Sequence, residues 1–429
     1  MPLVESLKAS ARATLEILSG YASAHKEARR MAQLERSISP RFVKPSSGHL
    51  ESAIAWLKRA QDLSDVSSDA SSAAGGVAWG YRARRPVRSS LPLGWVAPYP
   101  ETTGYIIPTM LRFGALTGDK DCVSRAHRMA AWELEIQLPD GGIQGGIVGA
   151  EPVASSTFVT GQVLFGFAAA YEYFGEERIR TGAIRAGEFL LSCLDDSGRF
   201  VKGYSHFCES GAKAYEVRTG LGLAELGKVL DIPQFETAGS RTADYALSVQ
   251  QSNGWFDEND MDYNDGPLTH TIGYTLEGLH GLGTRLGRPD CLSAVERTLQ
   301  HLIPLIRPDG FLAGRFRKDW TPATDWCCLT GSAQIAGVFL RMYGQTRTPE
   351  YLEAGEKLLG FTCFTQDLRT GIPGIDGGIR GSYPFGAEYG QWCVLNWATK
   401  FFCDAVMDYL DLQSPGATYP ALSSSALRA

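Results

Sequence analysis

One histidine stands in a setting suited to proton transfer. His270 is one of seven histidines in the chain of 429 residues and lies in the segment 267–274, directly before Thr271-Ile272-Gly273. Histidine is the commonest general acid or base near neutral pH, because its unperturbed pKa is close to that range. The plainer alternative is a histidine that caps the start of a helix. We expect His270 to move a proton during catalysis.

A glutamate and a tyrosine form the second candidate pair. Glu101 and Tyr105 are four residues apart, so one turn of helix places them on the same face. A glutamate at the start of a helix also stabilises that helix without any catalytic role. We expect Tyr105 to be the alternative proton carrier and Glu101 to assist it.

Two further carboxylates could complete a hydrolytic site. The acidic loop 257–265 precedes His270, and Asp265 or Asp262 from this loop could act as an acid or a base. Asp325 precedes Trp326-Cys327-Cys328 and is another candidate. Glycoside hydrolysis needs two carboxyl groups across a pocket. Acidic loops are usually only solvated, and no calcium-loop spacing fits this one.

Arginines follow two of the glycine turns described below. Arg82 and Arg85 follow the first of these turns, and Arg315 follows the fifth. Runs of surface arginine are usually only solvated. Two runs on one rim of an acidic protein instead indicate an anionic substrate, such as a uronate or a phosphate ester, because guanidinium binds such groups with paired hydrogen bonds.

Large aromatic residues are frequent where loops are expected. An aromatic face stacks on the apolar face of a sugar and leaves the hydroxyl groups free. The alternative is that these side chains only cover the ends of the core. The aromatic residues predicted to bind substrate are Trp79, Tyr81, Trp95, Tyr99, Trp255, Tyr274, Trp326 and Trp392.

Composition narrows the class of protein. The net charge of −6 argues against nucleic-acid binding. We see no signal peptide and no apolar stretch near the ~20 residues that span a bilayer. The nine cysteines are scattered through helical patterns, which favours reduced thiols and a cytoplasmic location. Cys327 and Cys328 lack a partnering CxxC motif, so we expect neither a metal nor another cofactor.

A repeat of glycine turns organises these residues. The turn glycines Gly76, Gly141, Gly198, Gly254, Gly310 and Gly378 are separated by 65, 57, 56, 56 and 68 residues. Each block continues with an apolar helix, a short breaker and an amphipathic helix, which indicates an inner and an outer helix. Such a period is typical of repeated supersecondary units. The sequence therefore predicts an all-α fold, an (α/α)6 toroid of six helix hairpins.

The repeat also predicts where the site lies. Residues 71–412 should form the toroid, residues 1–70 an N-terminal helical extension and residues 413–429 a flexible tail. A Thr-Gly pair, as in Thr103-Gly104, recurs near the start of the inner helices, and we align Ala398-Thr399 as its degenerate sixth copy. Glycine there indicates close packing of neighbouring inner helices. All inner helices should start on one face, where His270, Glu101 and the aromatic residues would line a funnel.

With its glycine-turn repeat and aromatic mouth, the chain resembles the α/α-toroid carbohydrate-active enzymes. These include unsaturated glucuronyl hydrolases, toroid polysaccharide lyases, uronyl epimerases and N-acylglucosamine 2-epimerases. The segments 101–105, 269–271 and 381–384 also resemble uncharacterised bacterial proteins associated with extracellular-polysaccharide gene sets. The resemblance implies a small-molecule or oligosaccharide substrate, and no residue role is carried over from any one family.

We therefore expect an enzyme that processes an acidic saccharide by hydrolysis, β-elimination or epimerisation. One alternative is a terpenoid cyclase or prenyltransferase toroid that acts on a diphosphate. The spacing of Gln250 and Gly254 imitates a repeat of those proteins, but their Asp-x-Asp-Asp motif is absent. The other alternative is a toroid that binds a saccharide without catalysis.

Overall fold

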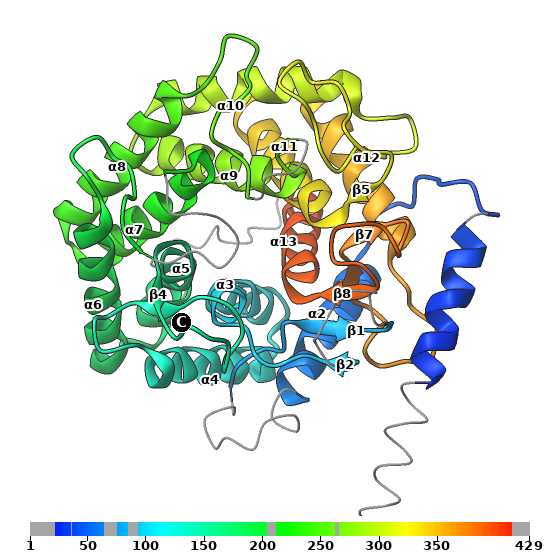
Figure 1. Cartoon of the computed structure of the whole chain (residues 1–429), viewed down its shortest axis with the longest axis horizontal. Helices are drawn as coiled ribbons and strands as arrows, with labels where there is room; N and C mark the ends of the chain where they lie inside the picture. The colour runs from blue at the N-terminus through cyan, green and yellow to red at the C-terminus, as the bar shows by residue number, and fades with distance from the viewer. Residues whose placement is uncertain are drawn as a thin grey trace, which may run out of the picture.

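Twelve helices form a closed ring of two layers in the computed structural model (Figure 1). The structure describes residues 22–35, 37–63, 75–84, 93–203, 212–261 and 266–413. The inner helices are α3 (Pro100–Thr117), α5 (Thr157–Phe174), α7 (Val217–Leu230), α9 (Thr269–Arg285), α11 (Leu329–Thr346) and α13 (Asn396–Gln413). The outer helices are α2 (Ser47–Asp62), α4 (Lys120–Ile136), α6 (Glu177–Cys193), α8 (Pro233–Ser248), α10 (Pro289–Leu302) and α12 (Pro349–Thr365). The predicted all-α (α/α)6 toroid is confirmed.

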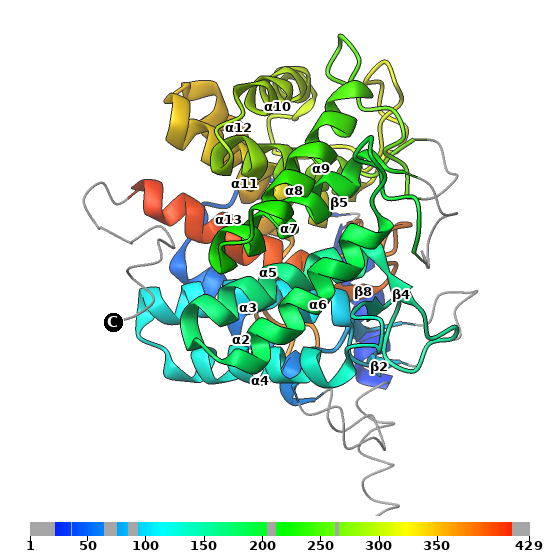
Figure 2. The ribbon, with the colours of Figure 1, turned by 90° about the vertical axis from the view of Figure 1, so that its left-hand side faces the viewer.

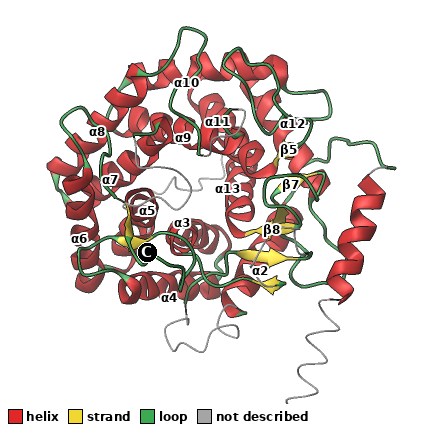
Figure 3. Cartoon of the chain, in the orientation of Figure 1, coloured by secondary structure: helices red, strands yellow, loops and turns green. Residues whose placement is uncertain are grey.

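Short strands and loops gather on one face of the ring. Figure 3 shows how little of the chain is strand, and Figure 2 shows the labelled strands β2, β4, β5 and β8 on one side. All strand pairs are antiparallel. One sheet has the order β2 (Gly94–Trp95), β1 (Gly80–Arg82), β8 (Cys393–Leu395) and β6 (Ile379–Arg380). Two pairs join β3 (Ile143–Gln144) to β4 (Ser155–Ser156) and β5 (Cys327–Cys328) to β7 (Ser382–Tyr383).

The first and last blocks close the ring through both layers. Strand β1 pairs with β8, with Tyr81 opposite Val394. Helix α13 packs against α3 in the inner layer and against α2 in the outer layer. Helix α2, which falls within the predicted N-terminal extension of residues 1–70, thus serves as the outer partner of α13. A further helix over residues 22–35 lies outside the ring (Figure 1). Gln413, the first residue of the predicted tail 413–429, belongs to α13, and the rest of the tail lies outside the described residues.

One glycine in each turn lies against the backbone of an outer helix. At Gly141 the φ angle is +92°, and a Cβ atom would lie 2.4 Å from the carbonyl oxygen of Arg185 in α6. The same contact with an outer-helix carbonyl recurs around the ring. The six glycines are Gly75, Gly141, Gly198, Gly254, Gly310 and Gly377, so in the first and sixth turns the contacting glycine precedes the predicted Gly76 and Gly378 by one residue. Only glycine tolerates both the positive φ and the close approach. The regular spacing of the turn glycines therefore arises because each turn packs against one outer helix.

A threonine in the inner helix holds each of three turns. Val77, Ile143 and Ile379 donate their backbone N–H groups to Thr103, Thr160 and Thr399, each over 2.9 Å. Thr399 is therefore equivalent to Thr103, and Lys400 stands at the glycine position. The alignment of Ala398-Thr399 with the Thr-Gly pairs was wrong by one residue. A lysine at the glycine position hid the true register.

The inner-helix glycines permit the close packing that the repeat predicts. A Cβ atom on Gly104 would lie 2.6 Å from Cα of Val163 in α5, and one on Gly331 would lie 2.6 Å from the backbone nitrogen of His270 in α9. Neighbouring inner helices thus touch along their backbones. The glycine at position 331 sets the start of α11 directly against the start of α9, which carries His270. Within the described part of the chain, no helix is long and apolar enough to cross a membrane.

We predict that Gly141→Ala destabilises the protein more than Gly175→Ala. Both glycines have positive φ, but nothing lies within 4 Å of a Cβ atom on Gly175. Alanine at position 175 should cost about 1 kcal/mol for its left-handed conformation. Alanine at position 141 should cost at least about 2 kcal/mol, because it also meets the carbonyl oxygen of Arg185. Thermal unfolding of the two variants measures the difference, and equal losses would contradict the packing role of the turn.

Candidate functional site

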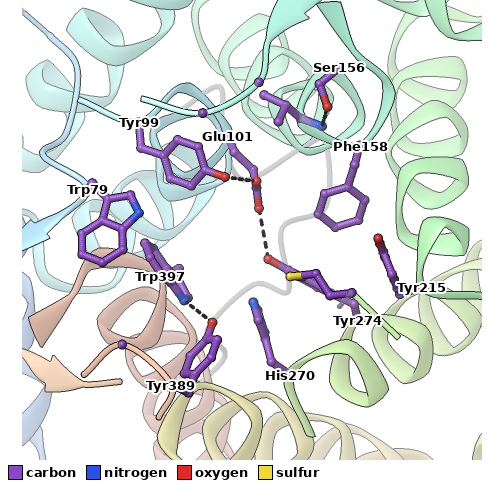
Figure 4. Close-up of a pocket in the computed structure, with 15 residues that line it drawn as sticks. Trp79, Tyr99, Glu101, Ser156, Phe158, Tyr215, His270, Tyr274, Tyr389 and Trp397 are labelled. Atoms are coloured by element: carbon purple, nitrogen blue, oxygen red, sulfur yellow. Dashed lines mark hydrogen bonds between the residues drawn. The ribbon is translucent and has the colours of Figure 1, made fainter. Parts of the chain in front are cut away.

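A cavity of about 180 Å³ opens where the inner helices begin (Figure 4). It combines aromatic walls with a single carboxyl group and a single imidazole among the described lining residues. The lining residues are Trp79, Tyr99, Glu101, Gly145, Gly146, Ser156, Phe158, Val159, Tyr215, Met261, His270, Tyr274, Tyr389, Gly390 and Trp397. The described lining contains no arginine or lysine. This composition suits a small ligand with an apolar face and a few polar groups.

Four lining residues occupy the same place in four repeats. Glu101, Phe158 and Trp397 each lie two residues before the threonine that holds a turn, and His270 lies two residues before Ile272 at the matching place in α9. The first turns of four of the six inner helices, α3, α5, α9 and α13, therefore each point one side chain into the cavity. The ring supplies the positions, and the residue types at those positions set the chemistry.

Glu101 is a buried acid held by two phenols. The hydroxyl of Tyr99 donates to Oε2 over 2.7 Å, and the hydroxyl of Tyr274 donates to Oε1 over 3.3 Å. Burial raises the pKa of Glu101 above its usual value, while the two hydrogen bonds and the charge of Arg218 oppose the rise. Burial disfavours the charged carboxylate, so Glu101 keeps its proton to higher pH than an exposed glutamate does. The residue is suited to act as an acid.

His270 is a buried base that faces the same cavity. Burial lowers the pKa of His270 to about 4, so its imidazole is neutral at pH 7. Its Nδ1 atom lies 2.6 Å from Oε1 of Gln334, and its ring packs 4.3 Å from that of Tyr274, centroid to centroid. Figure 4 shows a ring nitrogen of His270 pointing toward the hydroxyl group of Tyr274, which separates it from Glu101. An acid and a base thus lie on either side of one phenol.

The walls of the cavity are edge-packed aromatic rings. Phe158 lies 5.1 Å from Tyr274, and Trp79 lies 4.9 Å from Trp397, both measured between ring centroids. The indole nitrogen of Trp397 donates to the hydroxyl of Tyr389 over 2.8 Å. These contacts lock the rings in place and leave their remaining faces for a ligand.

Below the cavity, charged side chains connect the inner helices. Glu277 of α9 pairs with Arg218 of α7 over 3.1 Å and with Arg341 of α11 over 3.4 Å. Arg341 also reaches Asp408 of α13, which pairs with Arg112 of α3 over 2.6 Å. The pairs link five of the six inner helices. The sixth, α5, contributes Phe165, whose ring lies under the guanidinium of Arg218.

The structure brings together five of the predicted site residues. Trp79, Tyr99, Glu101, His270 and Tyr274 all line the cavity. The predicted proton carrier Tyr105 is not among the lining residues. It is buried one helical turn beyond Glu101, with the ammonium group of Lys400 5.1 Å from its ring and the guanidinium of Arg218 5.3 Å away.

The other predicted aromatic residues pack elsewhere in the molecule. Tyr81 and Trp95 pack against each other across the β1–β2 pair. Trp255 packs on Trp320. Trp326 lies in the loop before β5 and α11, and Trp392 lies in the loop between α12 and β8. Trp326 packs with Leu268 and Cys328, and Trp392 lies beneath the guanidinium of Arg84. The contacts of these five residues fit the alternative interpretation of the sequence, in which aromatic side chains cover the ends of the core.

Three further charged candidates, Asp325, Arg82 and Arg315, are not among the described lining residues of the cavity. Asp325 is exposed and is not among the lining residues. Arg82 is buried in β1, and Arg315 is buried against Glu388 over 3.0 Å and against the carbonyl oxygen of Gly266 over 2.8 Å. Arg315 thus already has an acidic partner within the chain. The candidates Asp265, Asp262 and Arg85 lie outside the described residues.

Several lining residues were missed in the sequence, for identifiable reasons. Trp397 falls at the funnel position only in the corrected register of α13. Tyr215 lies in the 3-10 helix η1 (Ala214–Glu216), before the inner helix begins. Tyr389 reaches the cavity from the loop before β8. The turn bond from Ile379 to Thr399 matches that from Val77 to Thr103, and this match is the signal that identifies Trp397.

A metal ion in a protein is usually held by three or more histidine, cysteine, aspartate or glutamate side chains among the ligands. No group of three or more histidine, cysteine, aspartate or glutamate side chains there is arranged to hold a metal ion.

Comparison with known proteins places the chain by its shape. No protein-family model and no curated protein matches the sequence. An unsaturated glucuronyl hydrolase specific for heparin matches with a TM-score of 0.64 and 15% identity, over 85% of this chain and 97% of that one. An unsaturated glucuronyl hydrolase from Bacillus sp. GL1 matches with a TM-score of 0.60 and 15% identity, over 83% and 96%. A D-mannose isomerase matches with a TM-score of 0.60 and 12% identity, over 85% and 97%.

These likenesses establish the fold. The predicted resemblance to the α/α-toroid carbohydrate-active enzymes is therefore confirmed for the architecture, and nearly the whole of each neighbour is covered. Unrelated activities share one toroid, so the activity has to be argued from the cavity itself.

We predict that Tyr99→Phe raises the pKa of Glu101 further, because a hydrogen bond to the ionised carboxylate is lost. Infrared difference spectra across a pH series, with Glu101→Gln as the blank, measure the titration. Tyr389→Phe is the control, since Tyr389 lines the same cavity and is hydrogen-bonded to Trp397. An unchanged midpoint in Tyr99→Phe would show that the phenol does not hold the ionised form.

Proposed function

We propose that the protein is an enzyme that acts on a saccharide by proton transfer at a carbon next to a carbonyl or carboxylate group. His270 is the base and Glu101 is the acid. The reaction is an epimerisation, an isomerisation or a β-elimination. The observation that carries the proposal is the pairing of a neutral imidazole with a buried carboxyl group in one aromatic cavity.

The environments of the two groups support these roles. A base must be unprotonated and an acid protonated before the reaction, and burial favours both of these neutral forms. The imidazole of His270, with a pKa of about 4, accepts a proton at neutral pH. The raised pKa of Glu101 lets the carboxyl group donate one. Tyr274 bonds to Glu101 and packs on His270, so it connects the two.

The walls and size of the cavity support a sugar as ligand. The rings of Trp79, Phe158 and Trp397 offer apolar faces on which a pyranose stacks. The volume of about 180 Å³ lies below the roughly 300–1,000 Å³ of sites for drug-sized ligands, which favours one sugar residue. The substrate is then a monosaccharide or the end of a short oligosaccharide.

Hydrolysis is the less favoured chemistry. It needs two carboxyl groups on opposite sides of the scissile bond. Among the described lining residues Glu101 is the only carboxylic acid, and Asp325 is exposed elsewhere. The acidic character of the substrate remains a prediction, because Arg315 is already paired with Glu388 and Arg85 lies outside the described residues.

The neighbours suggest the first substrates to test. Their names point to unsaturated glucuronides of glycosaminoglycans and to D-mannose. We would incubate the protein in D₂O with these compounds, uronate oligosaccharides and N-acylated hexosamines. Deuterium at a sugar carbon, detected by NMR, reports proton transfer, and absorbance of the unsaturated product reports elimination. New reducing ends without deuterium at carbon would overturn the proposal in favour of hydrolysis.

We predict that His270→Gln and Glu101→Gln each lower kcat by about 10²–10⁴-fold, the usual contribution of a general acid or base. Both changes keep side-chain size and leave the fold intact, which circular dichroism checks. His301→Gln is the control, because His301 lies on the outer helix α10 and is not among the residues that line the cavity. Full activity in either site variant would remove that residue from the mechanism.

The pH dependence follows from the two pKa shifts. As pH rises through about 4, His270 loses its proton and becomes a competent base, so kcat/KM should rise. At higher pH Glu101 loses its proton, and kcat/KM should fall at a pH above the ordinary range for glutamate. A bell-shaped profile is expected. A rising limb near pH 6.5 would mean that an ordinary exposed histidine is the base.

The alternative functions predict other outcomes in the same assays. The described lining offers no cationic side chain for the diphosphate of a prenyl substrate. Turnover of a prenyl diphosphate without turnover of any saccharide would favour the cyclase class. Tight binding of a saccharide without deuterium incorporation, elimination or hydrolysis would favour a binding protein.

A reducing, cytoplasmic location is part of the proposal. The eight described cysteines are all buried thiols, and proteins from oxidising compartments more often pair their cysteines. Cell fractionation tests the location directly.

A further inference from the structure

Each nitrogen of a neutral imidazole has a different role, and the proton sits on only one of them. We propose that Gln334, oriented by Glu277, is a positioning residue that fixes His270 with its proton on Nδ1 and leaves Nε2 as the acceptor in the cavity. The catalytic consequence rests on the proposed function. The assignment of the proton rests on the hydrogen-bond geometry alone.

The argument starts at Glu277, which lies below the cavity on α9. Its Oε2 atom accepts from Nε of Arg218 and from Nε2 of Gln334, each over 3.1 Å. Its Oε1 atom accepts from Arg341 over 3.4 Å. A carboxylate paired with two guanidinium groups is ionised and can only accept hydrogen bonds. The side-chain group of Gln334 that faces Glu277 must therefore be the amide NH₂.

The orientation of Gln334 then determines the tautomer of His270. With its NH₂ group directed to Glu277, the amide presents its oxygen to Nδ1 of His270 over 2.6 Å. An amide oxygen is an acceptor only, so Nδ1 has to be the donor. A neutral imidazole that carries its proton on Nδ1 has an unprotonated Nε2. That second nitrogen is the one available to take a proton from a ligand.

The surroundings of His270 keep the ring neutral as well as oriented. Three rings enclose it: Tyr274 of α9 at a centroid distance of 4.3 Å, Tyr389 of the loop before β8 at 5.8 Å, and Phe401 of α13 at 6.2 Å. The negative charge of Glu277 and the positive charge of Arg218 act on His270 in opposite directions. Glu277 therefore orients Gln334 while Arg218 offsets its charge, which would otherwise favour the imidazolium.

The arrangement resembles a catalytic triad, except that Gln334 stands between the carboxylate of Glu277 and the imidazole of His270. When a carboxylate contacts a histidine directly, it both orients the ring and stabilises the imidazolium. A neutral amide between the two keeps the orientation and avoids a full negative charge beside the ring. This suits a base that must stay unprotonated in an apolar cavity.

The tautomer can be measured without any substrate. In protein labelled with ¹⁵N-histidine, the two ring nitrogens of a neutral imidazole resonate at well-separated shifts, and His270→Gln assigns the signal of His270. We expect the protonated signal on Nδ1 at pH 7. Protonation on Nε2 in the native protein overturns the proposal, whether or not a saccharide is turned over.

Two variants separate orientation from simple packing. Gln334→Leu removes the acceptor, and Glu277→Gln removes the group that dictates the amide orientation. In both we expect signal from the Nε2-protonated form of His270 and a fall in kcat of at least about tenfold, with KM little changed. If Gln334→Leu does not fold, Glu277→Gln still tests the same step. The native tautomer in both variants would overturn the proposal.

The chain provides matched controls for both changes. Gln345 lies on the same helix as Gln334 and donates to Thr284 of α9 over 2.9 Å, away from the cavity. Gln345→Leu therefore loses an equivalent bond between α11 and α9, and Glu225→Gln loses an ion pair with Arg285. Both controls should leave the tautomer unchanged. A changed tautomer in Gln345→Leu would mean that loosened helix packing, rather than the amide, controls His270.

Discussion

The architecture of the site depends on one carboxylate, Glu277, whose side chain is 11% exposed. Removing the partners of a largely desolvated carboxylate is destabilising, and the neighbouring inner helices supply its donors. Arg218 comes from α7 and Arg341 from α11, while Glu277 itself lies on α9. The pairs hold three neighbouring inner helices in one relative position below the cavity. Through Gln334 the same carboxylate also reaches the imidazole of His270.

In the cavity above these ion pairs, one property of the surroundings, burial among aromatic rings, sets the protonation states of both an acid and a base. Aromatic rings exclude water from Glu101 and from His270, and the loss of hydration disfavours the charged form of each. For a carboxyl group the favoured form carries the proton, and for an imidazole it lacks the proton. One apolar environment therefore yields opposite catalytic roles from two residue types, which is how enzymes commonly run acid and base chemistry together.

The likeness to other toroids shows how little of the sequence the ring itself requires. At 12–15% identity, the three neighbours cover nearly their whole length on this chain. In this chain the ring needs turn glycines against outer-helix carbonyls, glycines between inner helices and an apolar core. Beside the threonines and glycines that hold the turns and pack the helices, the first turns of four inner helices each carry one residue that lines the cavity. Glu101, Phe158, His270 and Trp397 occupy such positions, so the chemistry can change without changing the ring.

The sequence by itself determined the ring and the face on which the site lies, because glycine positions and helical periodicity are local properties. It identified Glu101, His270, Tyr274, Tyr99 and Trp79 for the same reason. Only the tertiary structure decided which charges are already paired. Arg315 and Glu388 are 73 residues apart and Gln334 and Glu277 are 57 apart. Such long-range contacts follow from how the helices close into a ring, and no local pattern records them.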